Sequence, residues 1–243
     1  MDKKYIASVC ENLYKECLTA ISQYENNELI WVLNGSTLCN FLYNVVKINE
    51  EEVSKDFTKS CYDFIRQPKG DIDIIYKADR SYKFDFNNDA IKKFQSISQE
   101  QRTYNFVDSL SILSEKDYSQ LCTMETKNGL KFVAKKPQYL FIYKFMELLA
   151  VFHDDILNDN IENIINKNKN IINDVRNLYE ISINYCGYEE TMNIIDKLPN
   201  ISKYSYNLHK NDKDLYDIQI KKTLELIKNE EINQDEIIKR SNL

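Results

Sequence analysis

Glycine, proline and histidine are scarce in this chain, and several well-known site motifs are missing from it. Its 243 residues include four glycines, three prolines and two histidines, and the six cysteines form no Cys-x-x-Cys pair. The ligand sets of common structural zinc sites are therefore missing. The sequence also contains no P-loop lysine motif, no dinucleotide-binding glycine triplet and no nucleophile elbow, which excludes those enzyme classes.

Long apolar runs are missing as well, and the charge balance is acidic. No apolar run approaches the length needed to span a membrane, and the start of the chain is amphipathic, unlike a signal peptide. We therefore expect a cytoplasmic protein with no membrane partner and with mostly buried, reduced cysteines. The net charge of -6 disfavours a protein that coats nucleic acid, although it does not exclude an RNA substrate.

Apolar spacing in the first half of the chain predicts helices alternating with strands. Residues 29–33 form a short apolar run that ends at Asn34-Gly35-Ser36, and helical spacing then resumes through Val45, which indicates a strand, a tight turn and a helix. Residues 48–66 begin with glutamates and are interpreted as a charged helical insertion. An opening helix is predicted by a stripe at three- and four-residue steps, formed by Ile6, Val9, Cys10, Leu13, Cys17 and Ile21.

Further strands complete a mixed sheet. Residues 71–76 and 104–113 have strand composition, residues 89–97 suit a helix, and residues 120–126 and 130–134 flank a predicted hairpin turn. Beyond Pro137, helical spacing dominates. The fold class expected is α+β, with a mixed sheet flanked by helices in residues 1–135 and a helical C-terminal domain in residues 136–243.

Gly35 and Ser36 are candidates for binding phosphate. A glycine at a strand-to-helix turn lets a phosphate approach the backbone, and the following helix offers free amide groups. Ser36 adds a hydroxyl donor. Serine is also a favoured helix cap, so this turn needs a partner motif to indicate a function.

Asp71 and Asp73 supply that partner. Residues two apart on a strand point to the same face, so the two carboxylates are expected side by side. Adjacent anions repel each other, and a hard divalent cation such as Mg²⁺ or Mn²⁺ relieves the repulsion through oxygen ligands. Aspartate is also poorly tolerated in strands, which disfavours the alternative of two solvated surface side chains.

In combination, Leu33-Asn34-Gly35-Ser36 and Gly70-Asp71-Ile72-Asp73-Ile74 resemble the signature of the DNA polymerase β-like nucleotidyltransferase superfamily. The resemblance implies a nucleotidyltransferase fold in which the Gly-Ser turn binds the phosphates of an NTP and the strand carboxylates hold two metal ions. The implied reaction is NMP transfer to an acceptor hydroxyl, with metal-assisted departure of pyrophosphate.

The later residues are most similar to the AbiEii-type nucleotidyltransferases, a family that includes toxins of toxin-antitoxin and phage-defence systems. That resemblance implies that Lys144 contacts the nucleotide phosphates and that Asp174 matches the first aspartate of a later motif, whose second acid is replaced by Asn177. It also implies an antitoxin as a partner. A snorkelling surface lysine is the structural alternative for Lys144.

The chain departs from the superfamily pattern in two respects. The interval between the Gly-Ser turn and the Asp-x-Asp motif is long, which an insertion at residues 48–66 explains. The third metal carboxylate is unassigned: Asp108 is favoured over Asp85, and without either the protein would be a catalytically weak nucleotide-binding or interaction module. The acceptor candidates are tRNA, a protein hydroxyl and a small molecule such as an aminoglycoside.

Two weaker motifs remain. Lys131, Lys135 and Lys136 form a basic cluster in the sequence, which could guide an acceptor or a triphosphate but is more often solvated surface. His153-Asp154 resembles the metal-binding pair of HD-type phosphohydrolases, which need more histidines than this chain has. A polar helix end is the preferred interpretation of His153.

Overall fold

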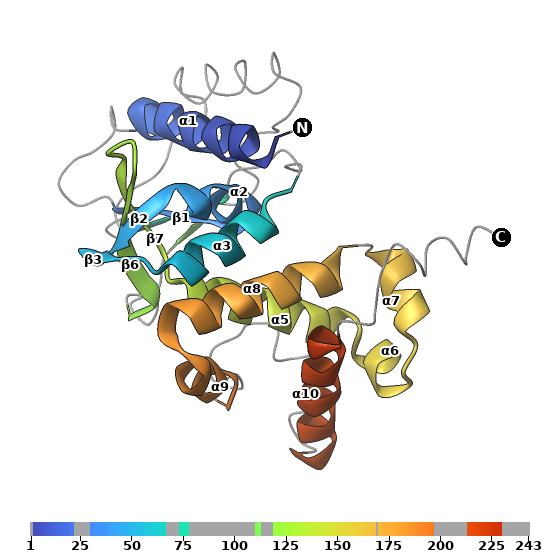
Figure 1. Ribbon diagram of the computed structural model, residues 1–243. Coiled ribbons are helices and arrows are strands. Elements are labelled where there is room, and N and C mark those ends of the chain that lie inside the picture. The colour runs from blue at the N-terminus through green and yellow to red at the C-terminus, as the bar shows by residue number, and fades with distance from the viewer. Residues whose placement is uncertain are drawn as a thin grey trace. The chain divides into compact units, whose positions relative to one another are not determined.

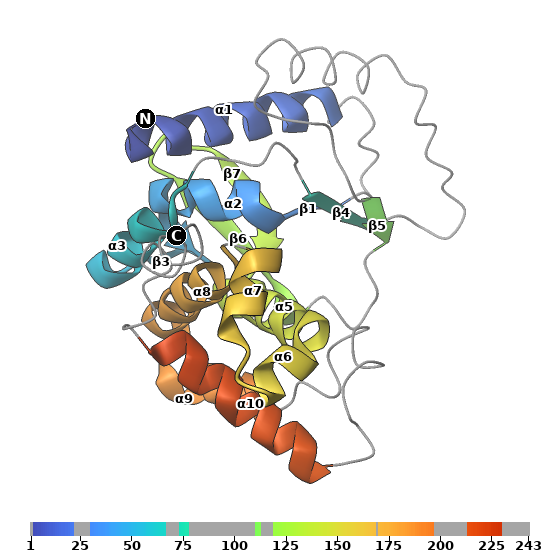
Figure 2. The same cartoon turned by 90° about the vertical axis from the view of Figure 1, so that its right-hand side faces the viewer.

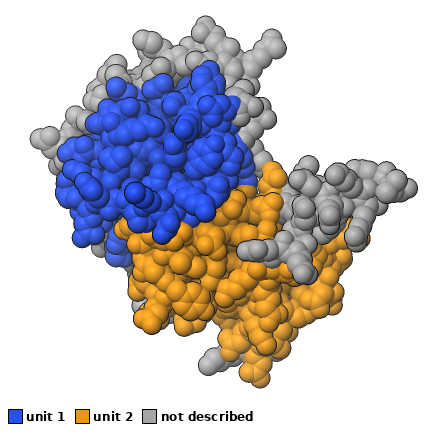
Figure 3. Space-filling model, viewed as in Figure 1, with its two compact units in different colours: residues 1–136 blue, residues 137–243 orange. Residues whose placement is uncertain are grey.

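The fold is known from a computed structural model, which describes residues 2–21, 30–66, 73–77, 110–112, 119–168, 170–196 and 213–229. The chain forms two compact units, Met1–Lys136 and Pro137–Leu243 (Figure 3). The predicted boundary followed residue 135. The first unit combines helices with a sheet and the second is helical, so the α+β class is confirmed.

A seven-stranded mixed sheet forms the centre of the first unit. Its order is β3-β2-β6-β7-β1-β4-β5. The pairs β1–β7 and β4–β5 are parallel and the other neighbouring pairs are antiparallel. The predicted hairpin of β6 and β7 is confirmed. The strands are β1 (Ile30–Asn34), β2 (Val45–Ile48), β3 (Glu51–Glu52), β4 (Asp73–Lys77), β5 (Leu110–Ile112), β6 (Leu121–Thr126) and β7 (Lys131–Lys135).

Helices α1 (Lys3–Ile21) and α2 (Gly35–Phe41) lie over the same face of this sheet (Figure 1, Figure 2). The rings of Tyr14 on α1 and Phe41 on α2 are 5.7 Å apart, and Tyr14 meets Phe132 of β7 at 5.5 Å. These buried rings explain the apolar stripe of the opening helix, because they supply its partner surface. A 3-10 turn, η2 (Leu42–Asn44), and α3 (Lys55–Phe64) complete the helices described in this unit.

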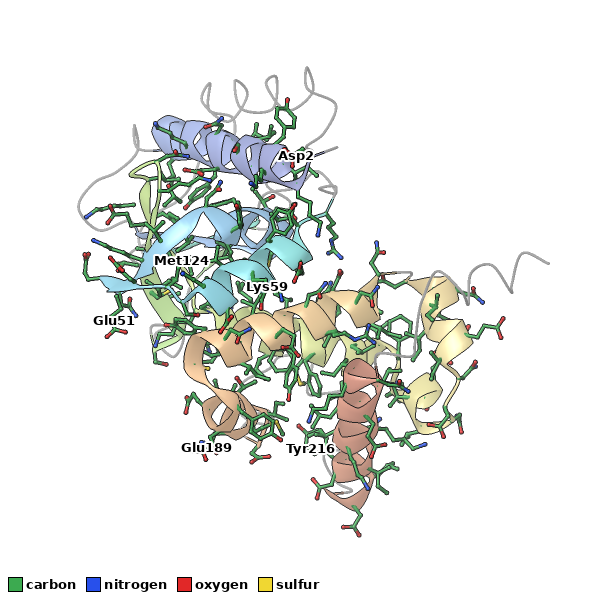
Figure 4. All side chains as sticks on the ribbon, viewed as in Figure 1. Asp2, Glu51, Lys59, Met124, Glu189 and Tyr216 are labelled. Carbon is green, nitrogen blue, oxygen red and sulfur yellow. The ribbon has the colours of Figure 1, made fainter. Side chains whose placement is uncertain are left out.

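The interpretation of residues 48–66 as a helical insertion was wrong for its first part, and so was the assignment of Val45 to a helix. Val45–Ile48 and Glu51–Glu52 form the hairpin β2–β3, and the helix begins only at Lys55. The cause is a contact with a distant part of the chain, because Asn49 is hydrogen-bonded to Thr123 of β6. The Asn49 N–H donates to the Thr123 carbonyl at 2.9 Å, and the Asn49 side chain accepts from the Thr123 N–H. Figure 4 shows Glu51 on the outer strand β3, where charged, exposed residues discourage edge-to-edge pairing.

The turn of this hairpin gives a first prediction. Glu50 has a φ of 68°, a left-handed backbone conformation. This conformation is unfavourable for a residue with a Cβ atom and is not unfavourable for glycine. Glu50→Gly is therefore expected to raise the free energy of unfolding of the protein by about 0.5–1 kcal/mol in urea titrations. Glu51→Gly is the matched control: it removes the same charge from a strand position and should be destabilising. Equal effects of the two substitutions would contradict this account.

The second unit is built around two long helices, α5 and α8, which pack along each other. Phe141 of α5 contacts Phe145 and the ring of Tyr179 on α8, at 5.5 and 5.4 Å. The isoleucines Ile164 and Ile165 of α7 and Ile171 and Ile172 of α8 are buried. The helices are α5 (Pro137–Val151), α6 (His153–Leu157), α7 (Ile161–Lys167), α8 (Ile171–Cys186), α9 (Tyr188–Asp196) and α10 (Lys213–Lys228).

Two sequence predictions lie wholly or largely outside the described residues: the helix at 89–97, and all of the 104–113 strand except β5 (Leu110–Ile112). Within the described parts of the chain, no helix is both long and apolar enough to cross a membrane.

Candidate functional site

The pairing of β1 with β4 brings together two motifs that are far apart in the sequence. The two strands are antiparallel, and Asn34, the last residue of β1, is the Cα partner of Asp73, the first residue of β4. Gly35 follows Asn34 directly and begins α2. The Gly-Ser turn and the start of β4 are thus adjacent, at the end of the strands where β1 finishes.

Two further strands begin or finish at this same end of the sheet. Strand β5 is parallel to β4, so both begin here, and β7 is parallel to β1, so both end here. The last residue of β7 (Lys135), the last residue of β1 (Asn34) and the starts of β4 and β5 therefore lie at the same end of the sheet. Strand termini that meet in this way let residues from several chain segments converge on one ligand.

Gly35 has the backbone conformation that its sequence position suggested. Its φ is 75°, in the left-handed region that favours glycine, and it is half-buried. Helix α2 has only seven residues, so its dipole adds little, and the adjacency of Gly35 to β4 is the more informative feature. For Ser36 the structure describes the backbone alone, at the second position of α2.

The predicted metal ligands are described in part. Asp73 is placed as the first residue of β4, whereas Asp71, Asp85 and Asp108 lie outside the described residues. Among the residues that are described, no group of three or more histidine, cysteine, aspartate or glutamate side chains could hold a metal ion. The donor chemistry of two aspartates suits Mg²⁺ or Mn²⁺, since hard cations take carboxylate oxygens and complete their shells with water and phosphate.

Lys144 and Asp174 lie on the two central helices of the second unit. The Lys144 ammonium donates to a carboxylate oxygen of Glu147 at 2.7 Å, and 28% of the Lys144 side chain is exposed. This contact is what the structural alternative, a surface lysine, would make. Asp174, in the first turn of α8, is only 4% exposed. A buried carboxylate one turn into a helix must be compensated locally, which distinguishes Asp174 from an ordinary surface acid.

The three-lysine cluster read from the sequence is divided by the fold. Lys131 begins β7 and pairs with Glu125 at 3.4 Å, while Lys135 ends the same strand, about 13 Å away at 3.3 Å per residue. Lys136 donates to the Ser119 carbonyl at 2.7 Å. Of the three lysines, only Lys135 and Lys136 therefore lie at the end of the sheet where Gly35 and Asp73 are found.

The histidine-aspartate pair has a structural role in the second unit. His153 begins α6, and its Nε2 lies 3.3 Å from Asp154. The neighbouring Asp155 accepts from Asn163 and Lys167, which lowers the pKa of Asp155, with the Asn163 hydrogen bond as the largest cause. These contacts join α6 to α7, and they fit the polar helix-end interpretation better than a metal site.

The sequence analysis did not single out Glu11 and did not predict that Lys135 is buried. Glu11 is 3% exposed and its carboxyl oxygens accept hydrogen bonds from Thr126, Asn44 and Asn128, which joins α1 to η2 and to the β6–β7 turn. Lys135 is 4% exposed. Their burial could have been inferred from their positions in the sequence, because Glu11 lies next to the apolar stripe of α1 and Lys135 is the last residue of an apolar strand.

The described cysteines do not contribute a nucleophile to this site. Cys10, Cys39, Cys61, Cys122 and Cys186 are free thiols, all but Cys186 buried. Burial raises the pKa of Cys122 to about 12 and that of Cys61 well above its ordinary value, so both thiols stay protonated near neutral pH.

Comparison of the chain with protein-family models, with curated proteins and with solved structures gives no significant match in any of the three. The assignment of the site therefore depends on the residues and topology of this chain.

Proposed function

We propose that this chain is a metal-dependent nucleotidyltransferase of the DNA polymerase β-like superfamily, which transfers NMP from an NTP to an acceptor hydroxyl. The observation that supports the proposal most strongly is the pairing of Asn34 with Asp73, which puts the Gly35-Ser36 turn beside the start of β4. Phosphate-binding backbone and metal-binding carboxylates have to be adjacent if one Mg·NTP is to engage both.

Each residue has a defined role in this proposal. Gly35 and Ser36 hold the nucleotide phosphates, and Asp71 and Asp73 hold Mg²⁺ or Mn²⁺. The bound ion would neutralise phosphate charge and stabilise the departing pyrophosphate. The resemblance adds Lys144 and Asp174 of the second unit as nucleotide-binding residues.

The reaction proceeds by in-line displacement. The acceptor oxygen attacks the α-phosphorus, the bond from the α-phosphorus to the bridging oxygen breaks, and pyrophosphate leaves. Asp108, with Asp85 as the alternative, would be the third metal carboxylate and would accept the proton of the acceptor hydroxyl. The acceptor belongs to one of three classes, a tRNA, a protein hydroxyl or a small molecule. If the protein is a toxin, its expression inhibits growth and a cognate antitoxin restores it.

The test is isothermal titration of the full chain with each of the four NTPs, with and without Mg²⁺. We expect binding of at least one NTP that depends on Mg²⁺ and that weakens by about 100-fold or more in the Asp71→Asn/Asp73→Asn double variant, because both ligands of the ion are altered. The control is Asp56→Asn/Asp63→Asn, which makes the same chemical change at two exposed positions of α3. Lack of binding by every NTP would refute the proposal.

The alternative function is that of a catalytically weak nucleotide-binding or interaction module. The third metal carboxylate distinguishes the two functions, and both candidates for it, Asp108 and Asp85, lie outside the described residues. Under this alternative the protein binds Mg·NTP in the titration above yet transfers no NMP.

A further inference from the structure

The second unit contains a pocket that the proposed reaction does not use. It lies between the α6–α7 segment and the last turns of α10 and has a volume of about 170 Å³. Both ribbon views show α6 and α10 side by side (Figure 1, Figure 2). A cavity of about 150 Å³ can hold a molecule the size of benzene, so this pocket admits a small organic ligand and is too small for a nucleotide.

The inner lining of the pocket is apolar. It includes Ile156, Ile164 and Leu226, which are at most 8% exposed, and the half-buried Ile161. Apolar ligand surface that leaves water for these side chains favours binding. The pocket therefore suits a ligand with an apolar body.

The charged residues that line the pocket are mostly acidic. Asp155, Asp159 and Glu225 contribute three carboxylates and Lys222 contributes one ammonium group, which gives the lining a net charge of -2. Among the described residues, no three histidine, cysteine, aspartate or glutamate side chains are arranged to hold a metal ion. The charge of the lining therefore favours an organic cation over a metal ion.

Two of the three carboxylates are engaged in strong hydrogen bonds within the unit. Asp159 accepts from the Lys222 ammonium at 2.7 Å, and Lys222 also donates to the Leu157 carbonyl at 2.9 Å, which joins α10 to the end of α6. Asp155 accepts from Asn163 at 2.6 Å, which joins α6 to α7. These contacts hold the walls of the pocket in place, so the pocket is formed before a ligand binds.

Glu225 is the carboxylate that can exchange its partner for a ligand. Its ion pair with Lys221 spans 4.0 Å, and the side chains of Lys221 and Glu225 are 78% and 66% exposed. An exposed ion pair at this distance contributes little stability, because water and salt screen it. An ammonium group in the pocket would gain a closer and less hydrated contact with Glu225.

We propose that this pocket binds a small organic cation, whose apolar body lies against the isoleucines of α6 and α7 and whose ammonium group binds Glu225. A primary amine with a single ring or a short alkyl chain matches both the volume and the charge of the pocket. The site includes neither Lys144 nor Asp174, so it does not depend on the proposed nucleotide site.

The experiment titrates the full chain, with ¹³C-labelled isoleucine methyl groups, with three probes of similar size. Benzylamine is protonated at neutral pH, benzyl alcohol is neutral and benzoate is an anion. We expect benzylamine to shift the methyl signals of Ile156, Ile161 and Ile164 with a dissociation constant of about 1 mM or below. Benzyl alcohol should bind about 10-fold more weakly than benzylamine, and benzoate more weakly still. Equal affinities for the amine and the alcohol would overturn the proposal.

Three variants test the residues of the pocket. Glu225→Gln changes an exposed position and should weaken benzylamine binding by about 3- to 10-fold while leaving benzyl alcohol binding unchanged. Asp217→Asn is the control: it removes one negative charge from an exposed position of the same helix, about 12 Å away along its axis, and should match the wild type. Ile161→Trp should fill the pocket and prevent the binding of both probes.

Three results would overturn the proposal: no saturable shift of the wild-type signals with benzylamine, wild-type affinity for benzylamine in Glu225→Gln, or benzylamine binding that persists in Ile161→Trp. None of them bears on the nucleotidyltransferase proposal, which the NTP titration tests separately.

Discussion

Asp73→Asn is expected to lower NMP transfer by about 100- to 1,000-fold, because it replaces a carboxylate that we propose to bind the metal ion by a neutral amide. The measurement is incorporation of label from an α-³²P NTP into total RNA, protein or small-molecule extracts. Label in the γ-phosphate should not be transferred, since it leaves with pyrophosphate. The position of Asp73 at the start of β4, beside Asn34, is the structural basis of this expectation.

Control variants make this result specific. Asp63→Asn alters an exposed aspartate at the end of α3 and should leave transfer unchanged. Asp108→Asn should retain Mg·NTP binding and lose transfer if Asp108 accepts the acceptor proton, and Asp85→Asn tests the other assignment in the same way. Transfer at the wild-type rate by Asp73→Asn would refute the site. Transfer by neither the wild type nor any variant, with intact NTP binding, would favour the interaction module.

The largest effect on stability is expected at Glu11. Its carboxyl oxygens accept from Thr126 Oγ1 at 2.7 Å, from Asn44 Nδ2 at 2.7 Å and from Asn128 Nδ2 at 3.1 Å. Glu11→Ala removes the carboxyl group, so the three donors lose the acceptor that they share. We expect a loss of about 2–4 kcal/mol in the free energy of unfolding, measured by urea titration.

Asn12→Ala is the control for this substitution, because Asn12 is exposed on the same helix. Alanine is the better helix former, so Asn12→Ala should be neutral or slightly stabilising. Glu11→Gln should lie between the two variants, since an amide keeps one acceptor oxygen but turns an N–H₂ group toward donors. A loss below about 0.5 kcal/mol in Glu11→Ala would show that the network contributes little.

Local patterns in the sequence were sufficient for most of the elements near the site. The apolar run before Asn34, the glycine at a position with φ of 75° and the apolar spacing after it predicted β1, the turn and α2. The hairpin of β6 and β7 and the start of α5 at Pro137 were predicted correctly for the same reason. In each case the residues that determine the backbone conformation are neighbours in the chain.

The hairpin β2–β3 shows where local patterns fail. Residues 48–52 are rich in glutamate, which favours helix over strand by intrinsic propensity. Their conformation depends on hydrogen bonds between Asn49 and Thr123, a residue far along the chain, and on a strand position at the edge where charged side chains are exposed. Long-range pairing overrides propensity there.

The sequence by itself determined the α+β class and the two motifs proposed to bind phosphate and metal, because each depends on residues within a few positions of one another. Only the tertiary structure decided that β1 pairs with β4, so that Asn34 meets Asp73. It also separated Lys131 from Lys135 and buried Lys135 and Glu11. Strand order, register and burial arise from contacts between distant segments, whose free energies depend on the whole core and not on any one stretch of the chain.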